Sequence, residues 1–331
     1  MRSALRAAML LLLPSLAFAQ AKPTPTPDHH ARKPDDVFRR QELSRGVYVV
    51  YGKGGNVGFL AGTDAVVVVD SQFKELAPGI VQQIKGVTEK PIRYLVNTHH
   101  HGDHTGGNEV FKSFAVIIAH DNVRTRMLAS PQTILKEYPA YLEEAKKKGD
   151  AEGVKQLEEA IDWAKKVKIE EIAAPVLTFD SGVRIHVGDE TIGVWHTPPA
   201  HTDGDSVIYF EKANVLHMGD LFFHEIIPFI DVRSGGSVRG YLDAIDKVIA
   251  KVPANVRIIP GHGEVTDVAG LKVFRQYIAD VMDEARKARA AGKTKEEFLK
   301  SVDLPAYRSW DGYADGFKDN CAAAWDEAGA P

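Results

Sequence analysis

Six consecutive residues, His99-His100-His101-Gly102-Asp103-His104, place four imidazoles and one carboxylate in a short stretch of the chain. In an extended segment, residues two apart project to the same side, so His99 and His101 are able to face one ion. Asp103 and His104 then remain available to a second ion. Imidazole nitrogens together with a carboxylate oxygen suit divalent zinc, and a catalytic zinc site keeps a position open for water. The run therefore predicts a metal centre.

Three further polar residues, His201, Asp220 and His262, each follow a predicted strand. Strand ends that feed loops are where a rigid scaffold presents functional groups, so these side chains are expected to converge with the histidine run. A six-residue motif with three later strand-end residues indicates a metal site rather than separate structural histidines.

These residues resemble those of the metallo-β-lactamase superfamily, whose His-x-His-x-Asp-His motif is present in full, and the resemblance extends from about Val47 to His262. It implies an α/β fold, a four-layered αβ/βα sandwich of two mixed β-sheets flanked by helices. It also implies two Zn²⁺ ions, with Fe and Mn as alternatives. The implied metal ligands are His99, His101 and His201 for one ion, Asp103, His104 and His262 for the other, and Asp220 as the bridge; Asp70 is implied to support them from behind.

The chemistry implied by this resemblance is hydrolysis. Paired metal ions ~3.5–4 Å apart hold a hydroxide, polarise a carbonyl or phosphoryl oxygen, and lower the pKa of bound water toward ~7. Asp103 is expected to be the catalytic residue that orients the hydroxide. His224 follows Asp220 by four residues and is expected in a loop near the pocket, as a candidate substrate contact. His100 is expected to point away from the ions, and His120, His186, His196 and His217 are expected to be structural.

The resemblance leaves the substrate open. An ester, thioester, lactone or amide carbonyl is the central expectation, because the bridging aspartate is similar to that of glyoxalase II and lactonases. β-Lactam hydrolysis is one alternative, although the largest lactamase subclass carries a bridging cysteine and a nearby lysine, whereas this chain has Asp220 followed by Leu221-Phe222-Phe223-His224. An iron-dependent oxidoreductase similar to persulfide dioxygenases is a second alternative, since the same ligands can hold iron.

Short apolar runs bounded by turn residues predict the strands that carry these side chains. The expected strands are 47–51, 57–61, 65–69, 92–96, 115–119, 183–187, 191–195, 206–210, 215–218 and 256–259, with helices over 74–85 and 238–251. Residues 131–171 predict a helical hairpin insertion broken at Gly149-Asp150, and a helical tail is expected over about 267–331.

The N-terminus predicts export. Residues 1–19 combine Arg2 and Arg6 with an apolar stretch and small residues at 17 and 19, as a cleavable signal peptide does. A proline-rich linker is expected over 20–42 and the domain over 43–331, in a periplasmic or secreted protein without a membrane span after cleavage.

The bulk composition excludes some partners. The net charge of −4 provides no basic field for nucleic acid, so a small molecule is the expected substrate. Cys321 is the single cysteine, which excludes a disulfide within the chain. The sequence does not define an oligomeric state.

Overall fold

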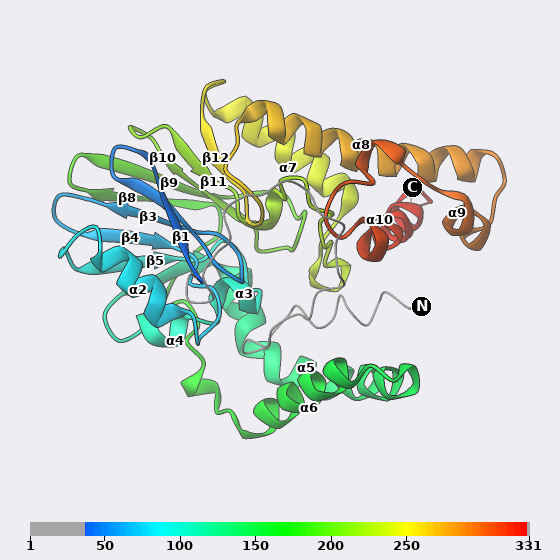
Figure 1. The fold of residues 1–331 in the computed structure, drawn as a ribbon, viewed down its shortest axis with the longest axis horizontal. Helices are drawn as coiled ribbons and strands as arrows, with labels where there is room; N and C mark the ends of the chain where they lie inside the picture. Colours follow the sequence, from blue (N-terminus) through cyan, green and yellow to red (C-terminus); the bar gives the residue numbers. More distant parts are fainter. Residues whose placement is uncertain (1–36, 330–331) are drawn as a thin grey trace.

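The computed structural model describes residues 37–329, so the predicted signal peptide and residues 20–36 of the predicted linker lie outside the described part. Two β-sheets face each other, with helices on both outer sides (Figure 1). The first sheet contains, in spatial order, β1 (Arg39–Ser44), β2 (Val47–Tyr51), β3 (Val57–Ala61), β4 (Val66–Val69), β5 (Ile92–Val96), β6 (Val116–His120) and β7 (Leu177–Phe179). The second contains β12 (Arg257–Ile259), β11 (Val215–His217), β10 (Ser206–Phe210), β9 (Glu190–His196) and β8 (Gly182–Val187).

Both sheets are mixed. Strands β1 to β4 pair antiparallel and β4 to β7 pair parallel, while β8 to β11 pair antiparallel and β11 pairs parallel with β12. Their facing sides form one apolar layer that includes Val67, Val69, Ile208 and Phe210, all buried. The predicted sandwich of two mixed sheets flanked by helices is confirmed.

The outer helices complete the four layers. On the first sheet lie α2 (Ala77–Lys85) and α4 (Asn108–Phe111), and the short α3 (Gly102–Thr105) follows the histidine run. On the second sheet lie α7 (Val238–Lys251) and α8 (Val268–Ala290), and α10 (Tyr313–Ala328), which follows α9 (Lys295–Ser301), packs against these helices. Single 3₁₀ turns are η1 (Ile169–Glu171), η2 (Gly219–Leu221), η3 (Val232–Ser234) and η4 (Pro305–Tyr307).

The first strand starts before the predicted domain boundary. Residues 39–42, expected in the linker, belong to β1 and pair with β2. Their sequence is almost entirely polar because β1 is the edge of its sheet, so the apolar alternation that marks an inner strand is missing. The Arg39 guanidinium lies 3.7 Å from the centre of the Tyr51 ring and pairs with Glu264, which ties this edge to the second half of the chain.

The helical hairpin consists of α5 (Asp121–Lys148) and α6 (Ala151–Lys166) and projects from the sandwich (Figure 1). The hairpin starts at Asp121, ten residues before the predicted start. Helix α5 continues through Pro131 and Pro139, although a proline inside a helix favours a break. The structure accommodates Pro131 inside α5: the Ser130 hydroxyl donates to the Met127 carbonyl, at 2.8 Å, which the proline nitrogen cannot satisfy.

The hairpin has its own apolar core, formed by residues of its two helices such as Tyr138 and Leu157. Several polar contacts join α5 to loops of the sandwich, and two of them are ion pairs. Arg126 makes a bidentate ion pair with Asp203, at 2.6 Å for both hydrogen bonds, and Glu137 pairs with Arg233 at 2.8 Å. The hairpin is therefore packed mainly on itself and fixed to the sandwich along α5.

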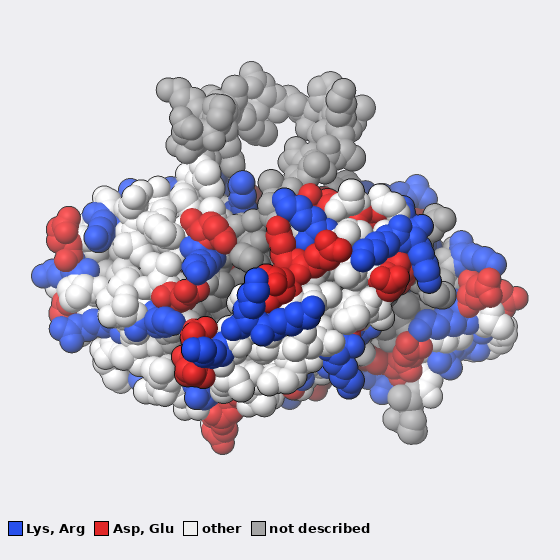
Figure 2. Space-filling view, turned by 90° about the horizontal axis from the view of Figure 1, so that it is seen from below, with Lys and Arg blue, Asp and Glu red and all other residues white. Residues whose placement is uncertain are grey.

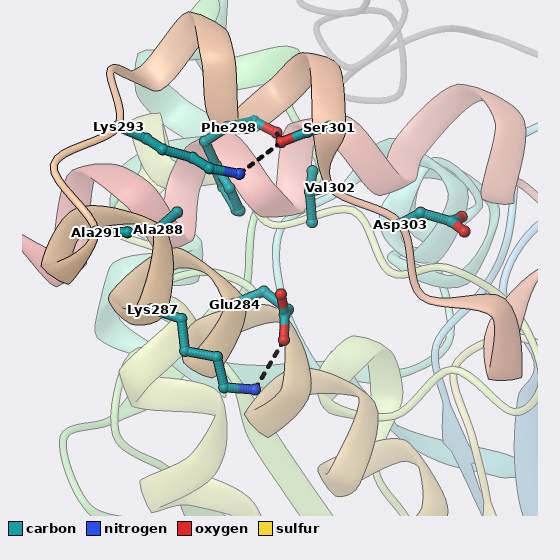
Figure 3. A pocket seen from close by; sticks show the side chains of 9 residues that line it. All are labelled: Glu284, Lys287, Ala288, Ala291, Lys293, Phe298, Ser301, Val302 and Asp303. Atoms are coloured by element: carbon teal, nitrogen blue, oxygen red, sulfur yellow. Dashed lines mark hydrogen bonds and ion pairs between the residues drawn. The ribbon is translucent and has the colours of Figure 1, made fainter.

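A cavity of about 310 Å³ lies among the C-terminal helices, between α8 and α9 (Figure 3). Its wall includes the ion pair of Lys287 with Glu284, at 2.9 Å, and the hydrogen bond from Lys293 to Ser301, at 3.1 Å. The residues that line it include none of the predicted metal ligands. This cavity is thus separate from the candidate site.

The surface shows no sorting of charge on the face drawn in Figure 2, where basic and acidic side chains are interspersed over the described residues. Within residues 37–329, no helix has the length and apolar character needed to cross a membrane.

Replacing Gly149 with alanine is expected to destabilise the hairpin by about 1 kcal/mol, because Gly149 has a φ of 68° and an L-residue is unfavourable in that conformation. The added methyl meets nothing within 4 Å, so no clash contributes. Since the hairpin core is separate, hydrogen exchange measured by mass spectrometry should be about fivefold faster in α6. Gly292→Ala, at another open glycine with φ of 73°, is the control and should leave α6 unchanged. Equal exchange in α6 of wild type and Gly149→Ala would contradict the expectation.

Candidate metal centre

The predicted ligands come from four strand ends at one end of the sandwich. The chain leaves β5 to form the histidine run and α3, leaves β9 before His201, leaves β11 before Asp220 in η2, and leaves β12 before His262. The structure brings all seven predicted ligands together, and all except His262 are almost fully buried. They form two groups whose ligand atoms lie within 4.8 Å of one another and could each hold a metal ion.

The first group contains His99, His101, His201 and Asp220. His101 Nδ1 lies 2.8 Å from His201 Nε2. Asp220 Oδ2 lies 3.3 Å from His201 Nε2 and 3.8 Å from His99 Nε2. Three imidazole nitrogens and one carboxylate oxygen therefore point at a common centre.

The second group contains Asp103, His104 and His262. His262 Nε2 lies 3.2 Å from Asp103 Oδ2 and 3.4 Å from His104 Nε2. The other oxygen of Asp220, Oδ1, lies 3.0 Å from His104 Nε2. Asp220 thus presents one oxygen to each group, which is the arrangement of a bridging carboxylate.

Hydrogen bonds on the far side of the first-group histidines define their protonation. His101 Nε2 donates to Asp231 Oδ2 at 3.1 Å, and His201 Nδ1 donates to the Phe229 carbonyl at 2.7 Å. When both rings are neutral, the remaining nitrogens, 2.8 Å apart, each direct a lone pair at the other, and these lone pairs repel unless a cation lies between them. This close pair supports a metal-binding site.

Asp70 supports two further histidines. Its Oδ2 accepts hydrogen bonds from His104 Nδ1, at 2.7 Å, and from the Thr98 hydroxyl, at 2.8 Å. Because the Thr98 hydroxyl donates its proton to Asp70, the Thr98 oxygen Oγ1 accepts a hydrogen bond from His99 Nδ1, at 3.0 Å. The Nε2 atom of His99 is consequently free of a proton and faces the first group. The Nε2 atom of His104 faces the second group; burial lowers the pKa of His104, but the carboxylates of Asp220, Asp103 and Asp70 raise it well above its usual value.

The donor set fits metal ions on independent grounds. His99 Nε2, Asp103 Oδ1 and Asp220 Oδ1 are buried without a hydrogen-bond partner among the described residues, a condition that is unfavourable unless a cation is present. Two glycines keep the space open. A Cβ atom at Gly261 would lie 2.0 Å from Asp220 Oδ1, and one at Gly55 would lie 2.3 Å from His104 Nε2.

The two groups differ in proton affinity. Burial lowers the pKa of His262, but the carboxylates of Asp220 and Asp103 raise it, to about 9. Burial lowers the pKa of His201 to about 4, although Asp220 opposes this shift. At neutral pH without metal, the second group therefore holds an extra proton on His262 and one on His104, whereas His201 in the first group is neutral.

Several positioning residues have little or no signal in the sequence. Asp231 stands alone after an apolar run, and its partner His101 is 130 residues away. Asp205 accepts from the backbone N–H of His201, at 2.7 Å, and from the Thr202 hydroxyl, at 2.6 Å. Burial raises the pKa of Asp205 to about 7, although its hydrogen bonds with Thr202 lower it. Only Thr98 could have been suspected, from its place directly before the histidine run.

The histidines outside the two groups have separate contacts. His224 lies beside His262, because its backbone N–H donates to the His262 carbonyl, at 3.0 Å, and its Nδ1 donates to the Glu264 carbonyl, at 2.8 Å. Its contact with substrate stays a prediction. His120 and His196 stack with ring centroids 3.8 Å apart at the end of the sheets.

The loop between Asp220 and Asp231 forms an apolar border of the site. The Phe223 ring stacks on His262 with centroids 5.2 Å apart, and the Phe229 ring lies 5.9 Å from that of His101. The loop is also joined to the C-terminal helical region, because a backbone bridge pairs Ile226 with Asp311. The Ile227 N–H donates to the Asp311 carbonyl at 2.9 Å.

Comparison with known families identifies the class. The model of the metallo-beta-lactamase superfamily matches residues 50–262. The chain belongs to the metallo-beta-lactamase superfamily, and its homologues are metallo-hydrolases of that superfamily.

Three curated relatives illustrate the range of similarity. The probable metallo-hydrolase YqjP of Bacillus subtilis (strain 168) is 24% identical over 67% of this chain and 71% of its own length. The linear primary-alkylsulfatase of Pseudomonas sp. (strain ATCC 19151) is 22% identical over 74% of this chain and 49% of its own. An uncharacterized protein of Aquifex aeolicus (strain VF5) is 29% identical over 33% of this chain and 51% of its own. This chain thus spans about half the length of the last two.

Solved structures share the fold. A metallo-beta-lactamase from Pontibacter korlensis superposes with a TM-score of 0.55 at 16% identity, over 73% of this chain and 99% of that one. A double mutant of the sec-alkyl sulfatase PisA1 gives a TM-score of 0.62 at 16% identity, over 87% of this chain and 50% of that one.

Metal uptake by the second group is expected to weaken about tenfold or more for each pH unit below 9, because His262 and His104 must each lose a proton before their nitrogens bind. Between pH 8 and pH 6 the affinity should fall about 100-fold or more. The first group should change little, since His201 loses its proton near pH 4. Competition titration of cobalt(II) against a chromophoric chelator measures both affinities, and a parallel pH dependence of the two would contradict this assignment.

Proposed function

We propose that the protein is an exported zinc-dependent hydrolase that attacks the carbonyl of an ester, thioester, lactone or amide. The observation that carries the proposal is the bridging geometry of Asp220, whose two oxygens lie at 3.3 Å from His201 and 3.0 Å from His104. Such a donor set binds two divalent ions and leaves positions open for water.

The residues of the chain divide the chemical work. Two zinc ions, when bound, lower the pKa of water toward ~7 and polarise the carbonyl oxygen. Asp103 uses Oδ2 toward His262, and its Oδ1 is buried with no hydrogen-bond partner in the described part of the chain, so Oδ1 is available to accept the proton of the attacking water. Asp231 accepts a hydrogen bond from His101 Nε2, and Asp70 accepts one from His104 Nδ1. These bonds orient the opposite nitrogens, His101 Nδ1 and His104 Nε2, toward the positions that the ions would occupy.

β-Lactam hydrolysis is the named alternative. The fold favours it, but the residues that follow Asp220, Leu221-Phe222-Phe223-His224, include no lysine to pair with a drug carboxylate. Phe223 occupies the face of His262, and the ion pairs of the predicted ligands join only histidines and carboxylates of the described residues. An iron-dependent reaction similar to that of persulfide dioxygenases is the alternative from another reaction class.

Export rests on the N-terminal residues, which lie outside the described part. We propose cleavage after Ala19, with cleavage after Ala21 as the second choice. N-terminal sequencing of protein recovered from a periplasmic or culture fraction tests this proposal, and an intact Met1 in the recovered protein would contradict it.

A substrate panel on the zinc-loaded mature protein tests the proposed reaction. It contains carboxylic esters, thioesters, lactones, nitrocefin, carbapenems and, because of the relative of that name, linear primary-alkyl sulfates. We expect chelator-sensitive hydrolysis among the first three classes. Turnover of the β-lactams alone supports the first alternative, and bound iron with persulfide oxidation supports the second. Two bound zinc ions without turnover of any compound would refute the proposal.

The Asp103→Asn variant connects that activity with the site. It keeps the size of the side chain but removes the charge that accepts the proton, so kcat should fall about 10²–10⁴-fold. Asp189→Asn is the matched control, since Asp189 is exposed in the turn between β8 and β9 and pairs with Lys212. Full activity of Asp103→Asn would rule out its assigned role.

A further inference from the structure

The turn between β2 and β3 touches both chain segments that carry the second metal group. This turn, residues 54–56, lies over the histidine run on one side and over the His262 loop on the other. The Gly55 N–H donates to the Asp103 carbonyl at 3.1 Å, and the Asn56 N–H donates to the Gly261 carbonyl at 2.7 Å. Two segments more than 150 residues apart in the chain are therefore joined through three residues.

The side chain of Asn56 holds the His262 loop from both sides. Its Nδ2 donates to the Pro260 carbonyl at 2.9 Å and to the Gly263 carbonyl at 2.8 Å, and the residue is only 4% exposed. His217 Nε2 donates to the Asn56 carbonyl at 3.0 Å and so holds the turn itself. The amide of Asn56 thus spans the ligand His262 with two hydrogen bonds.

The backbone of the turn lies directly against the other ligand. A Cβ at Gly55 would stand 2.3 Å from His104 Nε2, the nitrogen that faces the metal group. Only glycine permits this approach. A shift of the turn would therefore bring its backbone closer to His104 Nε2 or farther from it.

Gln72 holds the turn in that place. Its Nε2 donates to the Gly55 carbonyl at 2.8 Å, and the residue is fully buried. Its φ of 53° is a left-handed conformation that an L-residue adopts only when the surroundings enforce it. The enforcing contact includes the Gly107 N–H, which donates to the Gln72 carbonyl at 2.7 Å.

We propose that Asn56 and Gln72 are positioning residues for the second metal group, and that they set its affinity separately from that of the first group. The first group is oriented by Asp231, Thr98 and the Phe229 carbonyl, which lie outside the turn. The inference rests on the proposed function, in which both groups hold a metal ion.

The test uses variants that remain foldable. Gln72→Gly removes the amide contact and relaxes the positive φ, so the backbone should not be destabilised. Asn56→Asp keeps the size of the side chain but replaces its donating NH₂ group with an oxygen, which repels the carbonyl oxygens of Pro260 and Gly263. The matched control is Asn214→Gly: Asn214 also has a positive φ, 55°, and its amide donates to the Asn255 carbonyl at 3.2 Å, at the opposite end of β11 from Asp220.

Stepwise titration with cobalt(II), followed by the absorption spectrum, separates the two groups. His262→Ala, which lacks a ligand of the second group, supplies the reference spectrum and affinity of the first. Wild type should bind two equivalents. Gln72→Gly and Asn56→Asp should bind the second about 10–100-fold more weakly and the first as wild type does. Asn214→Gly should match wild type, and Asp231→Ala should weaken the first group instead.

The outcomes separate this inference from the proposed function. Two equivalents of unchanged affinity in Gln72→Gly, or an equal loss in both groups, would overturn the inference alone. A wild-type chain that binds a single equivalent would overturn the two-metal function, and the inference with it. Selective loss of the second equivalent in Gln72→Gly and Asn56→Asp supports both.

Discussion

The structure depends on one constraint, the burial of imidazole nitrogens and carboxylate oxygens around Asp220. Lone pairs that face one another repel, and burial removes the water that would otherwise solvate them. The fold keeps them in place by giving each imidazole a fixed acceptor on its far side, which is Asp231 for His101 and Asp70 for His104. A cation bound at the centre would offset the remaining repulsion between these groups, which the surrounding hydrogen bonds do not remove.

The sandwich permits this arrangement because the strands that precede the candidate ligands, β5, β9, β11 and β12, end on the same side of the two sheets. The valine-rich strands β2 and β4 are buried on both faces, so the loops that follow the strands are held by a rigid base. Local strain gathers there: Asp70 and Gln72 both have positive φ values, of 62° and 53°. Such conformations persist only when many contacts determine them, which is the condition that precise ligand placement requires.

The sequence predicted well the strands and the convergence of the seven candidate ligands that follow them, because both have local signals. The strands β2, β3, β5 and β10 occupy the predicted residues, since apolar runs between turn residues define them. The edge strand β1 is polar and the strand β7 has only three residues, so neither has such a pattern. The sequence did not predict the supporting residues, for another reason. Asn56 donates hydrogen bonds to backbone carbonyls 204 and 207 residues away, and no local pattern encodes contacts at that separation.

The backbone bridge between Ile226 and Asp311 has a consequence for the order of events during synthesis. Every ligand has left the ribosome once His262 has emerged, yet the loop that borders the site acquires its partner only when Asp311 follows. A nascent chain therefore contains all seven candidate ligands before the loop between Asp220 and Asp231 has its contact with Asp311. The border of the site is consequently completed after the candidate ligands, when the C-terminal region has folded against the loop.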